Sequence, residues 1–97
     1  MDRYLDDRPT VAYAVPFWID RSRAPRYELT NVGSEPVRAI TLTLLGSGLM
    51  LSNAPRRLLP GQSLRFTVRV DNAARNTIVV VRWFRPSGEQ YLWRVSF

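Results

Sequence analysis

One stretch decides the fold of this chain: Leu59-Pro60-Gly61-Gln62-Ser63-Leu64-Arg65-Phe66-Thr67-Val68-Arg69-Val70. It begins with a Pro-Gly turn and continues as a strand in which apolar and polar residues alternate strictly. The apolar members point to one side: Leu64, Phe66, Val68 and Val70. The polar members point to the other side: Arg65, Thr67 and Arg69. This period of two predicts a strand with one buried face and one solvated face.

The first third of the chain predicts two more strands. Residues 11–19 form the first, and Pro16 places it at the edge of a sheet because proline lacks the donor that an inner strand needs. One face of this strand is apolar: Val11, Tyr13, Val15, Phe17 and Ile19. Residues 20–25 predict a loop, and residues 26–30 predict a second strand. The apolar side of the second strand holds Tyr27 and Leu29.

Turn residues divide the middle of the chain at short intervals. The stretch Asn31-Val32-Gly33-Ser34-Glu35-Pro36 predicts a turn, because asparagine and glycine tolerate positive φ. Residues 37–45 predict a third strand with two distinct sides: Ile40, Leu42 and Leu44 opposite Thr41 and Thr43. A Gly-Ser-Gly break follows, and residues 49–51 predict a short fourth strand. Residues 53–61 predict the connection that returns to the alternating strand.

The last third of the chain predicts a β-hairpin. Residues 77–84 and 90–97 are its arms, and Arg85-Pro86-Ser87-Gly88-Glu89 joins them. A type I turn followed by a left-handed glycine fits this linker, and its first and last residues then face each other as an ion pair. The resulting register sets large side chains opposite one another: Trp83 and Tyr91, Val81 and Trp93, Val79 and Val95.

Six or seven short strands without a helical period predict an all-β fold, an immunoglobulin-like antiparallel β-sandwich of about seven strands. The chain resembles bacterial immunoglobulin-like modules of the CARDB-like kind over about residues 26–97. The matching pieces are turn motifs: Leu29-Thr30-Asn31-Val32-Gly33, Val37, and Leu59-Pro60-Gly61-Gln62-Ser63 with the strand through Phe66. Residues 11–97 are expected to fold as one domain, and residues 1–10 to form an acidic N-terminal head.

Composition limits the compartment and the chemistry. The 97 residues are 45% hydrophobic, which suffices for one core. No apolar run approaches the roughly 18 residues that a membrane span needs. The polar start, Met1-Asp2-Arg3-Tyr4-Leu5-Asp6-Asp7-Arg8, is unlike a secretory signal, so the sequence predicts a cytoplasmic protein without membrane contact. CARDB-like modules are usually extracellular repeats, whereas this chain is expected to be cytoplasmic. The resemblance therefore implies the fold of these modules but not their adhesion role.

The residue types argue against catalysis and metal binding. The chain has no histidine and no cysteine, so hydrolytic triads and thiolate or imidazole ligands are not available. The spacing of the carboxylates matches no calcium loop. Asp6 and Asp7 are the one adjacent carboxylate pair, and a solvated tail explains them better than an acid–base pair. We expect no enzymatic activity, no cofactor and no metal.

The basic charge is carried by arginine alone. All 14 basic residues are arginine, and the formal net charge is +6. Residues 1–20 hold four aspartates and two arginines, whereas residues 21–97 hold twelve arginines and four carboxylates. Codon bias in a GC-rich genome explains the absence of lysine; selection for guanidinium groups is the other explanation. An arginine-rich nucleic-acid-binding domain is the alternative function, although the arginines predict a scattered distribution over both ends and one face.

The outer face of the final hairpin is the predicted binding site. If Trp83 and Trp93 point inward, an unusually apolar set points outward: Ile78, Val80, Arg82, Phe84, Leu92 and Arg94. Apolar anchors surrounded by arginine are typical of a protein interface. The function predicted is a non-enzymatic protein-interaction module that binds a protein partner or a second copy of itself. The competing interpretation is that residues 1–19 fold back over this face, using Tyr4, Leu5 or Trp18.

Overall fold

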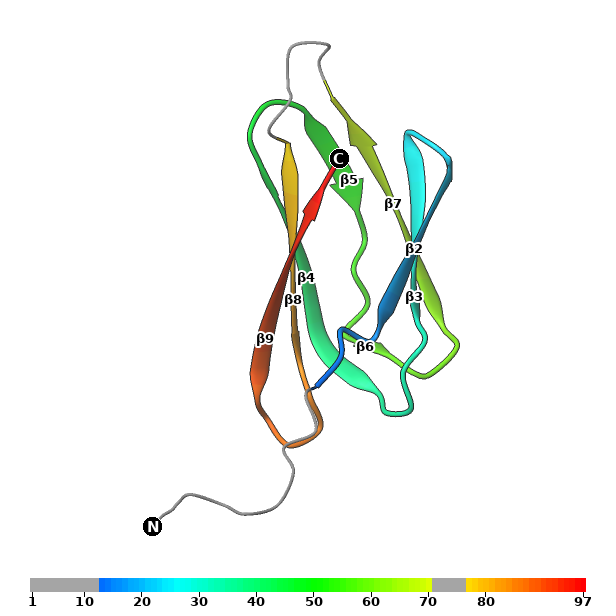
Figure 1. Cartoon of the computed structure of the whole chain (residues 1–97), viewed down its shortest axis with the longest axis vertical. Coiled ribbons are helices and arrows are strands. Elements are labelled where there is room, and N and C mark those ends of the chain that lie inside the picture. The colour runs from blue at the N-terminus through cyan, green and yellow to red at the C-terminus, as the bar shows by residue number, and fades with distance from the viewer. Residues whose placement is uncertain (1–12, 71–76) are drawn as a thin grey trace.

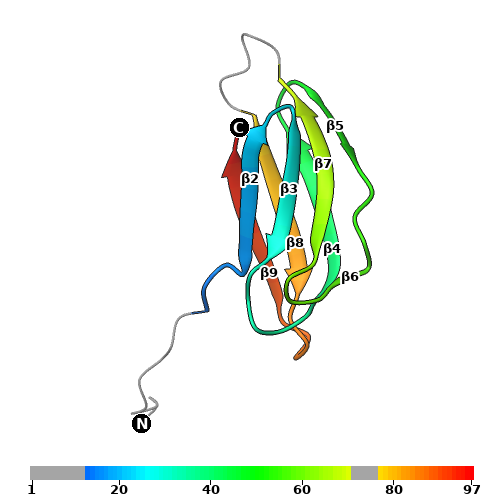
Figure 2. The same cartoon turned by 90° about the vertical axis from the view of Figure 1, so that its right-hand side faces the viewer.

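A computed structural model describes residues 13–70 and 77–97 of the chain. These residues form strands and no helix. The strands are β2 (Phe17–Arg23), β3 (Arg26–Asn31), β4 (Val37–Leu45), β5 (Leu49–Ser52), β6 (Arg57–Leu58), β7 (Ser63–Arg69), β8 (Ile78–Phe84) and β9 (Gln90–Ser96). They build two antiparallel sheets, which pack face to face (Figure 1, Figure 2). The predicted all-β sandwich is confirmed.

The order of the strands is immunoglobulin-like. One sheet has the order β2-β3-β7-β5 and the other has the order β6-β4-β8-β9. Read as strands A to G, the sheets are A-B-E-D and C-F-G, with β6 added beside the third strand. The chain after β4 pairs first with β7 as β5 and then with β4 as β6, so this segment changes sheets (Figure 1). Strand β6 is a correction, because residues 53–61 were expected to form only a connection.

The alternating stretch forms β7 at the centre of the first sheet. Leu64, Phe66 and Val68 are buried at 5%, 2% and 2% exposure, as the period of two predicts. Val70 is different: the strand ends at Arg69, and Val70 is 36% exposed. Its expected place on the buried face was therefore wrong, because the alternation holds only while the residue is paired in the sheet.

The hairpin β8–β9 has the predicted register. Trp83 lies opposite Tyr91, and the other two predicted pairs also match. Gly88 has φ of 95°, the left-handed conformation expected of the linker. The Arg85 amide donates to the Glu89 carbonyl at 2.9 Å, and the two side chains form an ion pair at 3.6 Å.

The first strand begins later than expected. Strand β2 covers Phe17–Arg23, so Asp20 to Arg23 belong to a strand and not to a loop. Val11 lies outside the described residues, and Val15 is 41% exposed instead of facing the core. Strand β2 is an edge strand, as Pro16 predicts, and an edge solvated on one side tolerates the charged residues at its end. A bulge shifts the register of β2 against β3 between Asp20 and Arg23. The Ser22 amide and hydroxyl both donate to Asp20 Oδ1 at this bulge.

Asn31 has a structural role that the turn chemistry did not predict. Neither Asn31 nor Gly33 has positive φ; Asn31 is the last residue of β3 and its side chain is fully buried. Asn31 Nδ2 donates to the Leu58 carbonyl at 2.9 Å and to the Glu35 carbonyl at 3.0 Å, and Oδ1 accepts from the Gly33 amide at 2.9 Å. Glycine is needed at position 33 because a Cβ there would lie 2.9 Å from Pro16 Cβ.

Aromatic side chains fill the end of the core that lies next to the β8–β9 turn. Trp83 is 1% exposed and contacts Phe17 edge to face, with 4.9 Å between ring centroids. Its Nε1 donates to the Tyr13 hydroxyl at 3.1 Å, so the one polar atom of the indole has a partner. Trp93, expected in the core, is partly buried and stacks on Phe17 at 6.3 Å.

Trp83→Ala should lower the free energy of unfolding by about 3–5 kcal/mol, because it removes a large buried aromatic side chain and leaves a cavity. Chemical denaturation monitored by far-ultraviolet circular dichroism measures the loss. Trp18→Ala is the matched control, since Trp18 is 58% exposed and its removal should change stability little. Equal melting of the two variants would contradict the register of the hairpin.

Asn31→Asp should destabilise the fold at neutral pH by roughly 2 kcal/mol or more, because it buries a carboxylate and removes the donor to two carbonyl oxygens. Burial near carbonyl oxygens raises the folded-state pKa of the new carboxyl above its unfolded value. The folded state then binds the proton more tightly, so the deficit relative to wild type should shrink as pH falls. Denaturation at about pH 7 and about pH 4.5 tests this. The exposed Asn53→Asp provides the control, and a deficit that does not depend on pH would refute the buried geometry.

Candidate functional site

The six predicted site residues lie together on the outer face of the second sheet. Strand β8 contributes four of them and β9 contributes two: Ile78, Val80, Arg82 and Phe84, with Leu92 and Arg94. Val80 pairs with Arg94 and Arg82 pairs with Leu92 across the hairpin. Ile78, Val80 and Phe84 are half-buried, whereas Leu92 is 60% exposed. The face is therefore apolar along β8 and open to solvent at its β9 edge.

Strands β4 and β6 extend this face with residues that sequence reasoning did not include. Leu45 pairs with Ile78 and is 45% exposed, so the apolar strip continues onto β4. Towards the hairpin end, Arg38 pairs with Phe84 and, on its other side, with Arg57. The alternation of side chains along β4 was the signal that could have found Arg38. It assigns Arg38 to the buried side, because it does not account for the bulge in the strand.

The bulge at Ala39 reverses the sides of β4. Arg38 pairs with Phe84 and Thr41 with Arg82, so two residues of β4 oppose Trp83. Ala39 has φ of 50°, a left-handed conformation that is unfavourable for a residue with a Cβ. Because of this left-handed conformation, Val37 is fully buried and Arg38 is exposed. Strict alternation with the buried Ile40 would instead put Arg38 in the core.

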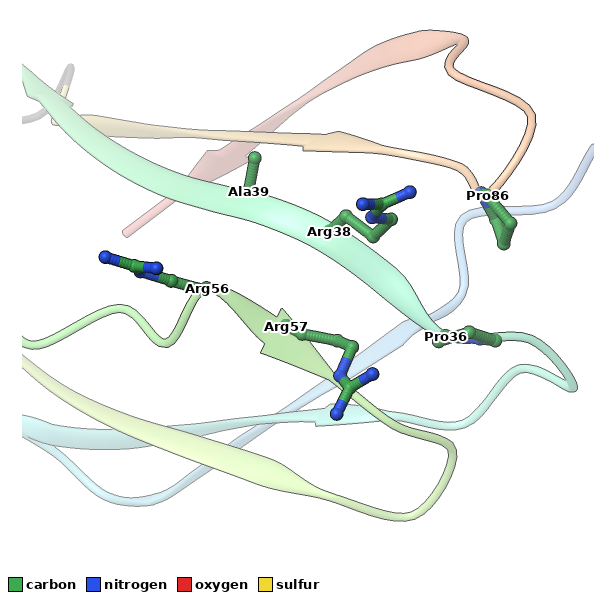
Figure 3. Close-up of a pocket in the computed structure, with 6 residues that line it drawn as sticks. All are labelled: Pro36, Arg38, Ala39, Arg56, Arg57 and Pro86. Carbon is green, nitrogen blue, oxygen red and sulfur yellow. The ribbon is translucent and has the colours of Figure 1, made fainter.

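Three arginines gather beside the bulge. A groove at the hairpin end of the sheet is lined by Pro36, Arg38, Ala39, Arg56, Arg57 and Pro86 (Figure 3). The Ala39 amide donates to the Arg56 carbonyl, which holds the segment before β6 against the bulge. Figure 3 shows the three guanidinium groups pointing in different directions and not towards one point.

The charge of this face has one sign. Five arginines belong to it or to its groove: Arg38, Arg56, Arg57, Arg82 and Arg94. The described residues contain four carboxylate side chains, of which two lie on the first sheet and two lie at the hairpin end, close to the groove. Asp20 and Glu28 are on the first sheet, where Glu28 pairs with Arg65 at 3.5 Å. Glu35 and Glu89 are engaged by Arg85 at the hairpin end. As the sequence suggested, the described arginines are scattered: five belong to this face or its groove, and five lie on the first sheet, namely Arg21, Arg23, Arg26, Arg65 and Arg69.

Arg82 is held in place on this face. Its Nε donates to Thr41 Oγ1 at 3.2 Å, and its guanidinium lies 5.7 Å from the centroid of the Phe84 ring. Such a contact orients the cation over the aromatic ring without neutralising it. Arg82 therefore presents a guanidinium group in a fixed position next to the apolar strip.

The described start of the chain does not cover the face. Residues 17–23 belong to the opposite sheet, and Trp18 lies on the outer side of that sheet at 58% exposure. The expectation that Trp18 covers the hairpin was therefore wrong, because β2 pairs with β3 and not with the hairpin. Tyr4 and Leu5, the other two candidates for this cover, lie outside the described residues, as does the pair Asp6-Asp7.

Arg85 contacts Tyr13 at the hairpin end through a cation–π interaction. The guanidinium lies 4.2 Å from the Tyr13 ring centroid and donates through Nε to Glu35 Oε1 at 2.7 Å. The hydrogen bond to Glu35 raises the pKa of Arg85, and burial raises the pKa of Tyr13, so both groups keep their protons at neutral pH. This cluster is a structural joint between the chain start and the β8–β9 turn.

Residues 13–70 and 77–97 hold no group of three or more side chains suited to bind a metal ion. The pKa of Asp20 is lowered by the hydrogen bonds from Ser22, so this carboxylate stays ionised and stabilises the β2 bulge.

No helix in the described part of the chain is long and apolar enough to cross a membrane. Comparisons with protein-family models, curated proteins and solved structures find no match to this chain.

Ala39→Gly should stabilise the protein by up to about 1 kcal/mol, because glycine adopts positive φ without a Cβ clash. A rise of a few degrees in melting temperature is expected for a domain of this size. Ala54→Gly is the control: Ala54 is exposed and does not have positive φ, so the change should be neutral or slightly destabilising. A lower melting temperature for Ala39→Gly would contradict the left-handed bulge.

Proposed function

We propose that this chain is a non-enzymatic protein-interaction module that binds through the outer face of β8 and β9, extended by β4 and β6. The observation that supports this function is the composition of that face. An apolar strip from Leu45 to Leu92 is bordered by Arg38, Arg82 and Arg94, and none of the described carboxylates is on the outer side of β4, β8 or β9. Apolar anchors with arginine at the border are the typical composition of a protein interface.

The apolar strip supplies the driving force for association. Leu92 and Leu45 are 60% and 45% exposed, and burying such side chains yields roughly 25 cal/mol for each Å² of apolar surface. Phe84 is the anchor at the hairpin end of the strip, where it pairs with Arg38 on one side and Gln90 on the other. A partner that covers this strip also removes water from the arginines around it, which strengthens their contacts with carboxylates.

Nucleic-acid binding is the second candidate, and the five arginines of this face and its groove favour it. Single-stranded nucleic acid is usually held by aromatic side chains on which bases stack. Among the described residues, Phe84 is the one aromatic side chain on this face, so successive bases would have a single ring on which to stack. The other aromatic residues of the hairpin, Tyr91 and Trp93, pack inward against Tyr13 and Phe17. The aliphatic surface of the strip fits a protein better than it fits bases.

The double variant Phe84→Asp, Leu92→Asp should abolish association while the domain remains folded, because it places two charges on the apolar strip. Cross-linking in the native host, followed by purification of the chain, measures partner capture. Sedimentation velocity measures self-association.

The matched control is Leu49→Asp, Leu51→Asp on β5 of the opposite sheet, where the side chains are 54% and 60% exposed. It adds the same charge to exposed apolar positions of the other sheet and should leave association intact. Equal capture and equal sedimentation for the two double variants would refute the proposed face. Melting curves show that each variant is folded.

A further inference from the structure

The groove beside Ala39 indicates the chemistry of the partner. It opens on the outer side of the second sheet and is continuous with the apolar strip, because Arg38 is the register partner of Phe84. Arg57, Arg38 and Phe84 therefore form one row across three neighbouring strands, at the usual strand spacing of about 4.8 Å. A molecule that follows this row meets two cations and then an aromatic ring.

We propose that the groove binds an acidic, extended segment of a protein partner, with its carboxylates on Arg38, Arg56 and Arg57 and an adjoining apolar side chain on Phe84. This inference rests on the proposed function and adds the class of ligand. The first support is charge complementarity, since no described carboxylate forms an ion pair with Arg38, Arg56 or Arg57. The two carboxylates near the groove, Glu35 and Glu89, pair with Arg85 instead. Arginine binds carboxylates through two parallel hydrogen bonds, which suits such a contact.

The second support is the cost of the arrangement to the free protein. Arg38 and Arg57 are direct cross-strand partners, and like charges in that position destabilise a sheet. Ala39 adds a left-handed backbone conformation at the point that turns Arg38 outward. The repulsion between the two arginines is offset when an anionic chain neutralises the pair. Strain that places a charge on an exposed face is common at binding sites.

The third support is the shape of the groove. It is an open groove of about 500 Å³, which suits an extended segment that lies along the surface better than an enclosed small molecule. The guanidinium groups point apart (Figure 3), so they suit several carboxylates spaced along a chain better than one phosphate or sulfate ion. Single-stranded nucleic acid also presents spaced anions, but in the part of the chain that the structure describes the neighbouring surface is aliphatic and Phe84 is the one ring available for stacking.

The test uses the full chain and a fluorescent peptide of four glutamates followed by two leucines. Fluorescence anisotropy at about 50 mM salt measures the dissociation constant, because surface charges are only partly screened there. Arg38→Glu, Arg57→Glu should weaken binding at least tenfold. Arg26→Glu, Arg69→Glu changes the net charge equally on the opposite sheet and should weaken binding less than threefold.

Two further probes decide between ligand classes. A peptide in which glutamine replaces glutamate should lose most of the binding, and an oligothymidylate of equal charge should bind more weakly than the acidic peptide. Tighter binding of the oligonucleotide, with the same loss in Arg38→Glu, Arg57→Glu, would overturn the proposal in favour of nucleic acid. Equal losses in the two charge-reversal variants would overturn it as non-specific attraction.

The chain's own aspartates are the remaining occupant to test. Replacement of Asp2, Asp6 and Asp7 by asparagine should leave the peptide affinity within about twofold of wild type. A gain of tenfold or more would show that the N-terminal acids compete for the groove, which overturns an intermolecular ligand. Phe84→Asp, Leu92→Asp distinguishes the two proposals. If this variant loses its partner while Arg38→Glu, Arg57→Glu keeps both partner and peptide, the face stands and the acidic segment fails.

Discussion

The buried amide of Asn31 connects the two sheets. It is the last residue of β3 in one sheet, and its Nδ2 donates to the Leu58 carbonyl in β6 of the other sheet. The same nitrogen donates to the Glu35 carbonyl at the entry to β4. Three hydrogen bonds on one fully buried side chain fix how the β3–β4 turn crosses the sandwich. The position of β6, and with it Arg57, depends on this crossing.

The two sides of the hairpin β8–β9 have different roles. Its inner side supplies Trp83 and Val79 to the core, and its outer side supplies the apolar strip and two arginines. Arg85 closes the end of the hairpin against Glu35 and Tyr13, so the turn is tied to both the β3–β4 connection and the chain start. A rigid inner side allows the outer side to present its residues at fixed spacing, which lowers the entropic cost of recognition.

Local pattern accounts for the parts of the fold that were predicted correctly. The period of two in β7 and the turn chemistry of the β8–β9 linker depend on neighbouring residues alone, and both match the structure. The errors occur where pairing with distant residues decides the outcome. Strand β2 continues through the polar residues Asp20 to Arg23 because β3 pairs with it. Strand β6 exists because β4 accepts two residues that carry no strand signal of their own.

The candidate site divides in the same way. The sequence by itself determined that Ile78, Val80, Phe84 and Leu92 share the side of the hairpin opposite Trp83, because alternation within a short hairpin leaves one register. Only the tertiary structure decided that arginines from β4 and the β6 region join them. The left-handed Ala39 turns Arg38 outward and Val37 inward, against the alternation of the strand. That reversal is stabilised by burial of Val37 and by pairing with β6, which are contacts between residues distant in sequence and invisible to local periodicity.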